Sequence, residues 1–129
     1  MLTQEKVNIT QIGQIAIPVQ DLERAVTFYR GVLGLPFLFQ VPNLAFFQCG
    51  EVRLLLNTPE GPGAPTKASV LYYKVENLQH AYTTLRQQGV NLVDEPHMIA
   101  KMVDHELWMF FFEDTEGNLL ALMSEVRQA

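Results

Sequence analysis

The chain has 129 residues, of which 48% are hydrophobic and 18% are charged, so length and composition indicate one ordinary globular domain. Its net charge of −5 comes from 14 acidic and 9 basic residues without a block of one sign, which argues against a nucleic-acid partner. The longest apolar run, residues 107–112, is far shorter than the roughly 20 residues of a membrane span, so we expect no membrane partner.

A repeated segment organises the chain. Residues 19–26 read VQDLERAV, and the related segment VENLQHAY occupies residues 75–82, at an offset of 56 residues. Such self-similarity is typical of a duplicated unit. Each copy follows a run rich in β-branched and aromatic residues, at 12–19 and at 69–75, and such a run predicts a strand.

Each copy of the repeat also predicts a helix. Asp21 and Asn77 are good N-caps, and Gly34 and Gly89 end the two helical patterns. Apolar residues recur between them at the three- and four-residue spacing of one buried stripe: Leu22, Ala25, Val26, Tyr29 and Leu33 in the first helix, and Leu78, Ala81, Tyr82 and Leu85 in the second.

Three strand-like segments follow each helix. In the first half they cover residues 36–40, 44–48 and 51–56, with turns at Pro42-Asn43 and Cys49-Gly50. In the second half they cover residues 90–93, 105–113 and 118–124, with a longer connection after the first of them and a turn over 114–117. The predicted order of elements, βαβββ, therefore occurs twice in the chain. We predict one domain over residues 1–129, made of modules 10–57 and 69–126 and a Gly- and Pro-rich linker over 58–68.

These features resemble the vicinal oxygen chelate superfamily of glyoxalase I, bleomycin-resistance proteins and extradiol dioxygenases. The resemblance rests on IAIPVQDLERAVTFYRGVLGL at residues 15–35, on EDTEGNLLAL at residues 113–122, and on the duplication. It implies an α+β fold in which two tandem βαβββ modules form a cupped mixed sheet, with helices on the outer face and a small-molecule site in the cup. It also implies a homodimer. The fold alone does not give the reaction, because the superfamily includes isomerases, epimerases, dioxygenases, transferases and binding proteins.

The resemblance implies four metal-ligand positions, which fall at Gln14, Arg53, Val70 and Ala121 in this chain. Gln14 is an acceptable ligand, whereas Arg53 is a permanent cation that repels a metal ion. Val70 and Ala121 carry no donor atom. Since several oxygen or nitrogen ligands must converge to hold a divalent ion, we expect that the inherited metal site is lost and that the protein has no cofactor.

Strand alternation predicts which residues line the cup instead. A turn at Cys49-Gly50 places Phe46 opposite Arg53. A turn over 114–117 places Phe110 opposite Ala121 and Trp108 opposite Met123. The predicted lining is Gln14, Phe46, Gln48, Arg53, Val70, Tyr72, Glu106, Trp108, Phe110, Ala121 and Met123. The residues that alternate with the lining residues along the strands, and so face the other side of the sheet, are aliphatic. They are expected to pack under the helices: Ile15, Ile17, Leu54, Leu56, Leu71, Leu120 and Leu122.

Two functional alternatives share this lining. In a metal-independent enzyme of lyase, isomerase or oxygenase type, Arg53 holds a carboxylate or enolate, and Glu106, His97 or His105 moves a proton. In a binding protein of the bleomycin-resistance type, the same surface sequesters an aromatic or amphipathic compound without chemistry. Either ligand is small, and an anionic or aromatic one fits the lining best.

Each candidate residue also has a structural interpretation. Arg53 and Glu106 could form only an ion pair, and the aromatic residues could fill a core. The two histidines and Glu106 could form a replacement metal site, although the neighbours His105 and Glu106 should face opposite sides of a strand.

The single cysteine and the start of the chain predict the compartment. Cys49 cannot form an internal disulfide, and it has no basic neighbour that would make it a nucleophile. The polar start MLTQEK does not look like a signal peptide. We therefore expect a cytoplasmic protein. His80 is interpreted as a solvated helix position.

Overall fold

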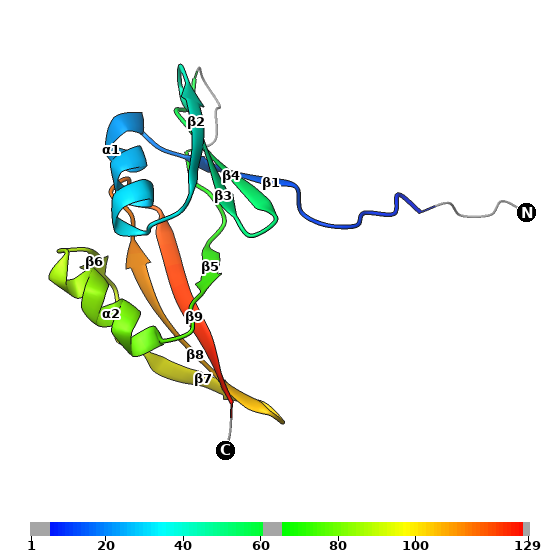
Figure 1. Ribbon diagram of the computed structural model, residues 1–129, viewed down its shortest axis with the longest axis vertical. Coiled ribbons are helices and arrows are strands. Elements are labelled where there is room, and N and C mark those ends of the chain that lie inside the picture. Colours follow the sequence, from blue (N-terminus) through cyan, green and yellow to red (C-terminus); the bar gives the residue numbers. More distant parts are fainter. Residues whose placement is uncertain (1–5, 61–65, 128–129) are drawn as a thin grey trace, which may run out of the picture.

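Two sheets, each with its own helix, make up the part of the chain that the computed structural model describes, residues 6–60 and 66–127 (Figure 1). The first sheet has the order β1-β4-β3-β2, and the second has the order β5-β9-β8-β6, with β7 also paired to β8. In each sheet one parallel pair, β1 with β4 and β5 with β9, accompanies antiparallel neighbours. The predicted α+β fold with mixed sheets is confirmed.

The elements of the first module follow the predicted order. They are β1 (Gln14–Pro18), α1 (Leu22–Thr27), the π-helix η1 (Phe28–Val32), β2 (Phe37–Val41), β3 (Leu44–Cys49) and β4 (Val52–Asn57). The predicted turn at Pro42-Asn43 is confirmed, and Asn43 has the positive φ of 69° that a type II turn requires at its second central residue. Residues 61–65 of the predicted linker lie outside the described residues.

The second module contains one strand that the sequence did not predict. Its elements are β5 (Leu71–Lys74), α2 (Leu78–Gln87), β6 (Asn91–Leu92), β7 (His97–Lys101), β8 (His105–Glu113) and β9 (Leu119–Arg127). The segment expected to be a plain connection contains β7, which pairs with β8. An irregularity between Met98 and Ala100 interrupts its alternation, and this explains why no strand pattern was visible.

Side-chain caps and glycines set the helix ends, as predicted. The Asp21 carboxylate accepts a hydrogen bond from the backbone N–H of Arg24 at 3.1 Å, and Asn77 accepts one from His80 at 3.0 Å. The first helix widens at its end, where the Leu33 N–H donates to the Phe28 carbonyl at 3.0 Å. Gly34 follows with a φ of 72°.

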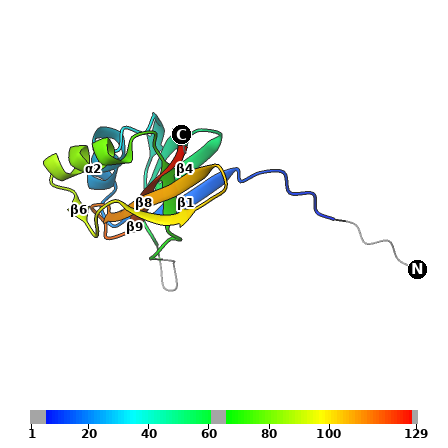
Figure 2. The same cartoon turned by 90° about the horizontal axis from the view of Figure 1, so that it is seen from below.

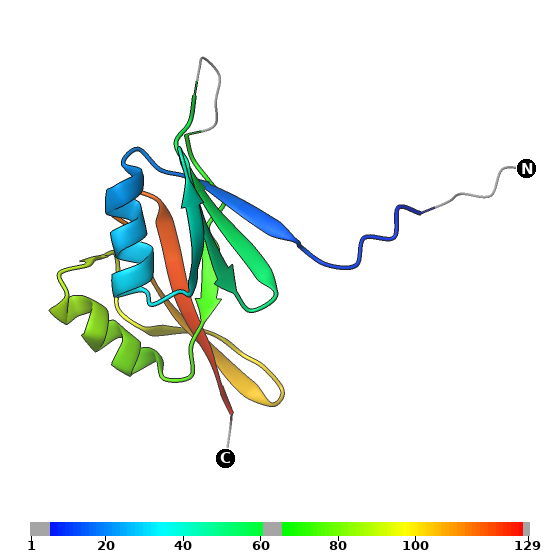
Figure 3. The same cartoon turned by 45° about the horizontal axis from the view of Figure 1, so that its top comes forward.

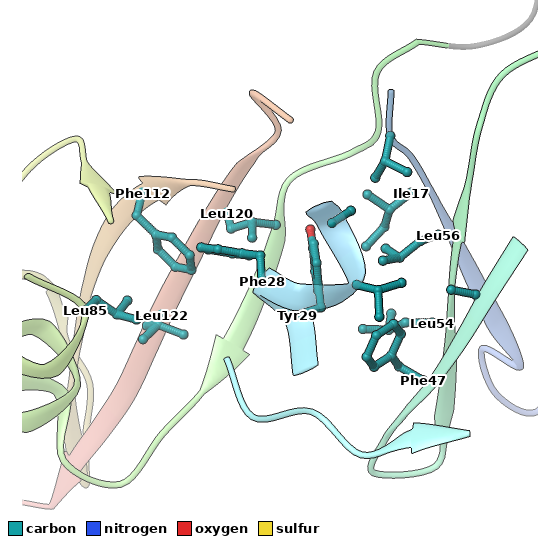
Figure 4. Packing of buried hydrophobic residues seen from close by; sticks show 14 of the residues in the cluster. Ile17, Phe28, Tyr29, Phe47, Leu54, Leu56, Leu85, Phe112, Leu120 and Leu122 are labelled. Carbon is teal, nitrogen blue, oxygen red and sulfur yellow. The ribbon is translucent and has the colours of Figure 1, made fainter. Parts of the chain in front are cut away.

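Both helices lie on the same side of the two sheets, and the core lies beneath them (Figures 1 and 2). Figure 4 shows that η1, which continues α1, contacts both modules, because Phe28 points toward Leu120 and Phe112 whereas Tyr29 lies beside Leu54 and Leu56. The single buried stripe predicted for this helix was therefore incomplete. The aliphatic residues predicted to pack under the helices include five that are buried: Ile17, Leu54, Leu56, Leu120 and Leu122.

The face of each sheet that points away from the helices is called the cup face below. Residues 6–12 run from β1 away from both sheets (Figures 1 and 3). Within the described residues, no helix is long and apolar enough to cross a bilayer.

Candidate functional site

Three polar side chains form a row across the cup face of the first sheet. Gln14 of β1 is in register with Arg53 of β4, and Arg53 is in register with Gln48 of β3. Registered partners on neighbouring strands share a face, and the next residue along β4, Leu54, is buried on the helix side. Arg53 and Gln14 are exposed and Gln48 is half-buried. The row therefore presents one guanidinium between two amides.

The predicted pairing of Arg53 with Phe46 was wrong, although Phe46 was assigned to the correct face of the sheet. Phe46 pairs with Leu55 instead, because the β3–β4 turn consists of Gly50 and Glu51. Gly50 has a φ of 59°, which fits the first central residue of a type II′ turn. The register differs from the prediction by two residues, so Phe46 stays on the cup face.

Phe39 lies next to Phe46 and was missed in the sequence. The two rings stack with centroids 4.4 Å apart and planes 20° apart, and Phe39 is 49% exposed. The predicted turn at Pro42-Asn43 already implied this pairing, since it places Val41 opposite Leu44 and hence Phe39 opposite Phe46. The polar row thus has an aromatic pair beside it on the same sheet.

Three predicted residues of the second sheet lie on the helix side, and their placement in the cup was wrong. Phe110 pairs with Leu122 and Trp108 with Ser124, one residue away from the predicted partners. Phe110 is fully buried and meets Tyr82 of α2 edge-on, with ring centroids 5.1 Å apart. The Trp108 indole donates to the Glu106 carboxylate at 3.0 Å. None of the three can therefore line the cup face.

The β8–β9 turn explains this error. It contains five residues rather than four, because Asn118 belongs to the turn and Glu113 pairs with Leu119. The Asn118 N–H donates to Asp114 Oδ1 at 2.8 Å, and its side-chain amide donates to the Pro18 carbonyl at 3.0 Å. A shift of one residue moves every side chain of the strand to the other face.

The cup face of the second sheet carries a different set of residues. Phe111 and Met109 of β8 share this face with Ala121 and Met123 of β9. Tyr72 of β5 is in register with Ala121, and its ring meets Phe111 edge-on with centroids 5.8 Å apart. Tyr72 and Met123 were therefore placed correctly, whereas Phe111 and Met109 were missed by the single-residue shift.

The two histidines lie on the second sheet. His97 begins β7 and is in register with Met109, and its Nδ1 is 2.8 Å from the Glu95 carbonyl. His105 Nδ1 is 2.7 Å from the Asp104 carboxylate. This hydrogen bond lowers the pKa of Asp104.

Glu125 completes a small charged cluster around His105. Its carboxylate lies 3.6 Å from His105 Nε2 and 2.6 Å from the Lys74 ammonium. The Lys74 hydrogen bond lowers the pKa of Glu125. Glu106 faces away from this cluster, so it does not join the two histidines. In the part of the chain that the structure describes, no group of three or more His, Cys, Asp or Glu side chains is arranged to hold a metal ion.

The inherited metal positions do not fit a metal ion either. Gln14 is the one position that offers a donor atom, and its registered neighbour on β4 is the Arg53 guanidinium. Ala121 contributes a methyl group beside Tyr72, and Val70 directly precedes β5. A cation next to the only ligand opposes binding of a second cation.

Comparison with known proteins identifies the family. Residues 11–122 match the family model of the Glyoxalase/Bleomycin resistance protein/Dioxygenase superfamily, so the chain belongs to this superfamily, and the resemblance stated from the sequence is confirmed. The protein is 28% identical over 126 residues to the uncharacterized protein YraH of Bacillus subtilis (strain 168), covering 84% of this chain and 94% of that protein.

Two further comparisons are informative. The chain is 26% identical over 109 residues to the mitochondrial methylmalonyl-CoA epimerase of Bos taurus, covering 72% of this chain but only 62% of the epimerase. A crystal structure of a superfamily member from Sphaerobacter thermophilus superposes with a TM-score of 0.75 at 24% identity, covering 91% of this chain and 98% of that one. This structural likeness supports the fold.

Proposed function

We propose that this chain is a metal-independent member of its superfamily that binds a small aromatic carboxylate on the cup face. The Gln14–Arg53–Gln48 row is the observation that carries the proposal. A guanidinium forms two parallel hydrogen bonds with a carboxylate, which an ammonium cannot do. The flanking amides add donors at the ends of the row, although one Gln48 N–H already donates to the Gly50 carbonyl at 2.7 Å.

The aromatic part of the ligand fits the neighbouring surface. Phe39 and Phe46 form a stacked pair beside the polar row, and an aromatic ring packs well on such a pair. An apolar surface next to a few polar groups that fix orientation is typical of small-molecule sites. Benzoate combines both features and is therefore the simplest probe.

A catalytic role is supported by the Asp104–His105 pair. A carboxylate 2.7 Å from His105 Nδ1 orients the imidazole, as in a general base. Glu106, the other candidate base, is hydrogen-bonded to Trp108 on the helix side and is no longer proposed. We infer an enzyme of lyase, isomerase or oxygenase type, and the epimerase among its relatives keeps the isomerase type among the candidates. The alternative is a binding protein that uses the same cup face.

Benzoate titration tests the anion site. We expect Arg53→Met to weaken benzoate binding by about 1 to 2 kcal/mol, since Arg53 is exposed and its charge-assisted hydrogen bonds are partly screened by water. Arg86→Met, on the exposed surface of α2, is the matched control and should bind benzoate like the wild type. Chemical shift changes of backbone amides give the affinity and the location. Equal affinity in all three proteins would contradict the site.

The same titration tests metal independence. Benzoate affinity should be unchanged after treatment with EDTA, because Gln14 alone cannot hold an ion beside Arg53. A loss of binding on chelation that zinc, nickel, iron or manganese restores would show that a metal takes part.

A further inference from the structure

A row of soft metal ligands crosses the cup face of the second sheet. His97 of β7 is in register with Met109 of β8, and Met109 is in register with Met123 of β9. The three side chains therefore lie on the same face of three neighbouring strands (Figure 1). This His97–Met109–Met123 row has no residue in common with the four inherited metal positions or with the polar row around Arg53 on the first sheet.

The spacing of the row fits one metal ion above its central residue. Opposite residues of antiparallel strands have Cβ atoms about 4.5 to 5.5 Å apart, so His97 and Met123 flank Met109 at about 5 Å on either side. Metal bonds to nitrogen and sulfur add about 2.0 to 2.3 Å to the reach of each side chain, to take the values for zinc. An imidazole and two flexible thioethers can therefore converge on one point above the sheet.

The hydrogen bond of His97 fixes which ring nitrogen carries the hydrogen atom. Its Nδ1 lies 2.8 Å from the Glu95 carbonyl, and a carbonyl oxygen only accepts, so Nδ1 is the donor. Nε2 of the neutral imidazole then presents a lone pair. Metal-binding histidines generally donate their other ring N–H to a carbonyl or carboxylate, which orients the ring. His97 already has this arrangement.

Met109, the central residue, is covered from the cup side. It is 8% exposed, yet it does not belong to the buried cluster that the described residues form under the helices. Side chains of its own face therefore cover it, and its opposite neighbours on that face are His97 and Met123. His97 is exposed and Met123 is half-buried, so the row can be reached from solvent.

The charges around the row are compatible with a monovalent cation. Asp94 Oδ2 lies 3.8 Å from His97 Nδ1 and supplies a negative charge. Lys74 of β5 is in register with Met123, but its ammonium is paired with the Glu125 carboxylate at 2.6 Å. The row itself is neutral and offers no carboxylate, the ligand that hard divalent ions prefer.

We propose that the His97–Met109–Met123 row binds one soft monovalent metal ion, Cu(I), through Nε2 of His97 and the Sδ atoms of Met109 and Met123. Thioether sulfur is a soft ligand that selects Cu(I), whereas zinc takes thiolate, imidazole and carboxylate ligands. The proposal does not depend on the benzoate site, which lies on the first sheet.

Methionine methyl groups report this site directly. Protein labelled with carbon-13 at the methionine methyl groups is titrated with Ag(I), a redox-stable ion of the same charge, and then with Cu(I) without oxygen. We expect the methyl signals of Met109 and Met123 to shift together and to stop shifting at one equivalent. The signal of Met98, which pairs with Trp108 and so faces the helix side, should not move. Zinc should shift none of the three.

Conservative variants test each ligand by competition for Cu(I) with bicinchoninate. Met109→Leu and Met123→Leu nearly keep the side-chain volume and should each weaken Cu(I) binding by about tenfold or more, as should His97→Asn. Met98→Leu is the matched control, and Cys49→Ser removes the only thiol, a competing soft ligand. Both should bind Cu(I) like the wild type. Amide spectra of the metal-free variants show that each is folded, and the exposed His97 keeps the test valid if Met109→Leu is not.

Three results would overturn the proposal. The methyl signals of Met109 and Met123 could stay in place with Ag(I) and Cu(I), or zinc could shift them as well. Met123→Leu and His97→Asn could bind Cu(I) as tightly as the wild type. Cys49→Ser could abolish the binding, which would place the ion on the first sheet instead.

Discussion

Glu116 connects the two modules through a single side chain. Its carboxylate, only 1% exposed, accepts a hydrogen bond from Arg24 Nε at 2.8 Å and from the backbone N–H groups of Gln20 and Asp21, each at 2.9 Å. Burial by itself would raise the pKa of Glu116, but the hydrogen bonds from Arg24, Asp21, Thr115 and Gln20 outweigh it and lower the pKa to about 2. Glu116 is thus ionised where α1 begins.

The stability of the protein should therefore depend on Glu116 in acid. The carboxyl group titrates near 4.5 in the unfolded chain and near 2 in the folded one. Its contribution, on the order of 3 kcal/mol, is complete above about pH 4.5 and is lost as the pH falls toward 2. Glu116→Gln should flatten this part of the pH dependence of the unfolding free energy, measured with urea. Glu51→Gln, an exposed turn position, is the control, and parallel curves for all three proteins would contradict this prediction.

The junction between the two modules also shows how far residue patterns alone could predict contacts. Arg24, Tyr29 and Asp114 belong to the two segments that carried the family resemblance, but periodicity predicted only a helix stripe and a turn. In the structure the Tyr29 hydroxyl donates to Asp114 Oδ2 at 2.7 Å, across 85 residues of sequence. Partners so distant in sequence cannot be read from local spacing.

At the level of elements, the helices and most strands were predictable, and the pairing of β8 with β9 was not. Asp21, Asn77, Gly34 and Gly89 act within a few residues of themselves, so the sequence displays their effect directly. The β8–β9 turn instead has five residues because Asn118 belongs to it, and Asn118 bonds both to Asp114 within the turn and to the Pro18 carbonyl, 100 residues earlier. The strand β7 was missed for a local reason, because an irregularity between Met98 and Ala100 interrupts its alternation.

Substitution of the neighbouring residues Phe110 and Phe111 tests the register of β8 with β9. Phe110→Ala should destabilise the fold by about 3 to 5 kcal/mol, because the ring is fully buried against α2. Phe111→Ala should cost less, about 1 to 2 kcal/mol, because its ring is only half-buried on the cup face beside Tyr72. Urea denaturation of both variants measures the difference. A larger loss of stability in Phe111→Ala than in Phe110→Ala would instead support the β8–β9 pairing predicted from the sequence.

For the whole molecule, we expect a homodimer. Tyr72 and Phe39 on the cup faces are each 49% exposed, and Val7 and Ile9 before β1 are 88% and 85% exposed. Exposed apolar side chains in such number favour association, and two-fold pairing is the commonest form of self-association. Sedimentation at micromolar concentration should give twice the chain mass of 14.7 kDa. A mass near that of a single chain would refute the dimer.

The sequence by itself determined the duplicated order of elements apart from β7, the two helices with their caps, the superfamily, and the shared face of Gln14, Gln48 and Arg53. These follow from periodicity, glycine and capping residues, which act over a few positions, and from motifs with fixed spacing. The tertiary structure decided which face carries Trp108, Phe110 and Glu106, because the five-residue turn pairs Glu113 with Leu119 and so shifts the register of the whole strand by one residue. It also decided that His97 lies opposite Met109, because β7 pairs with β8 in an irregular register that local patterns do not show.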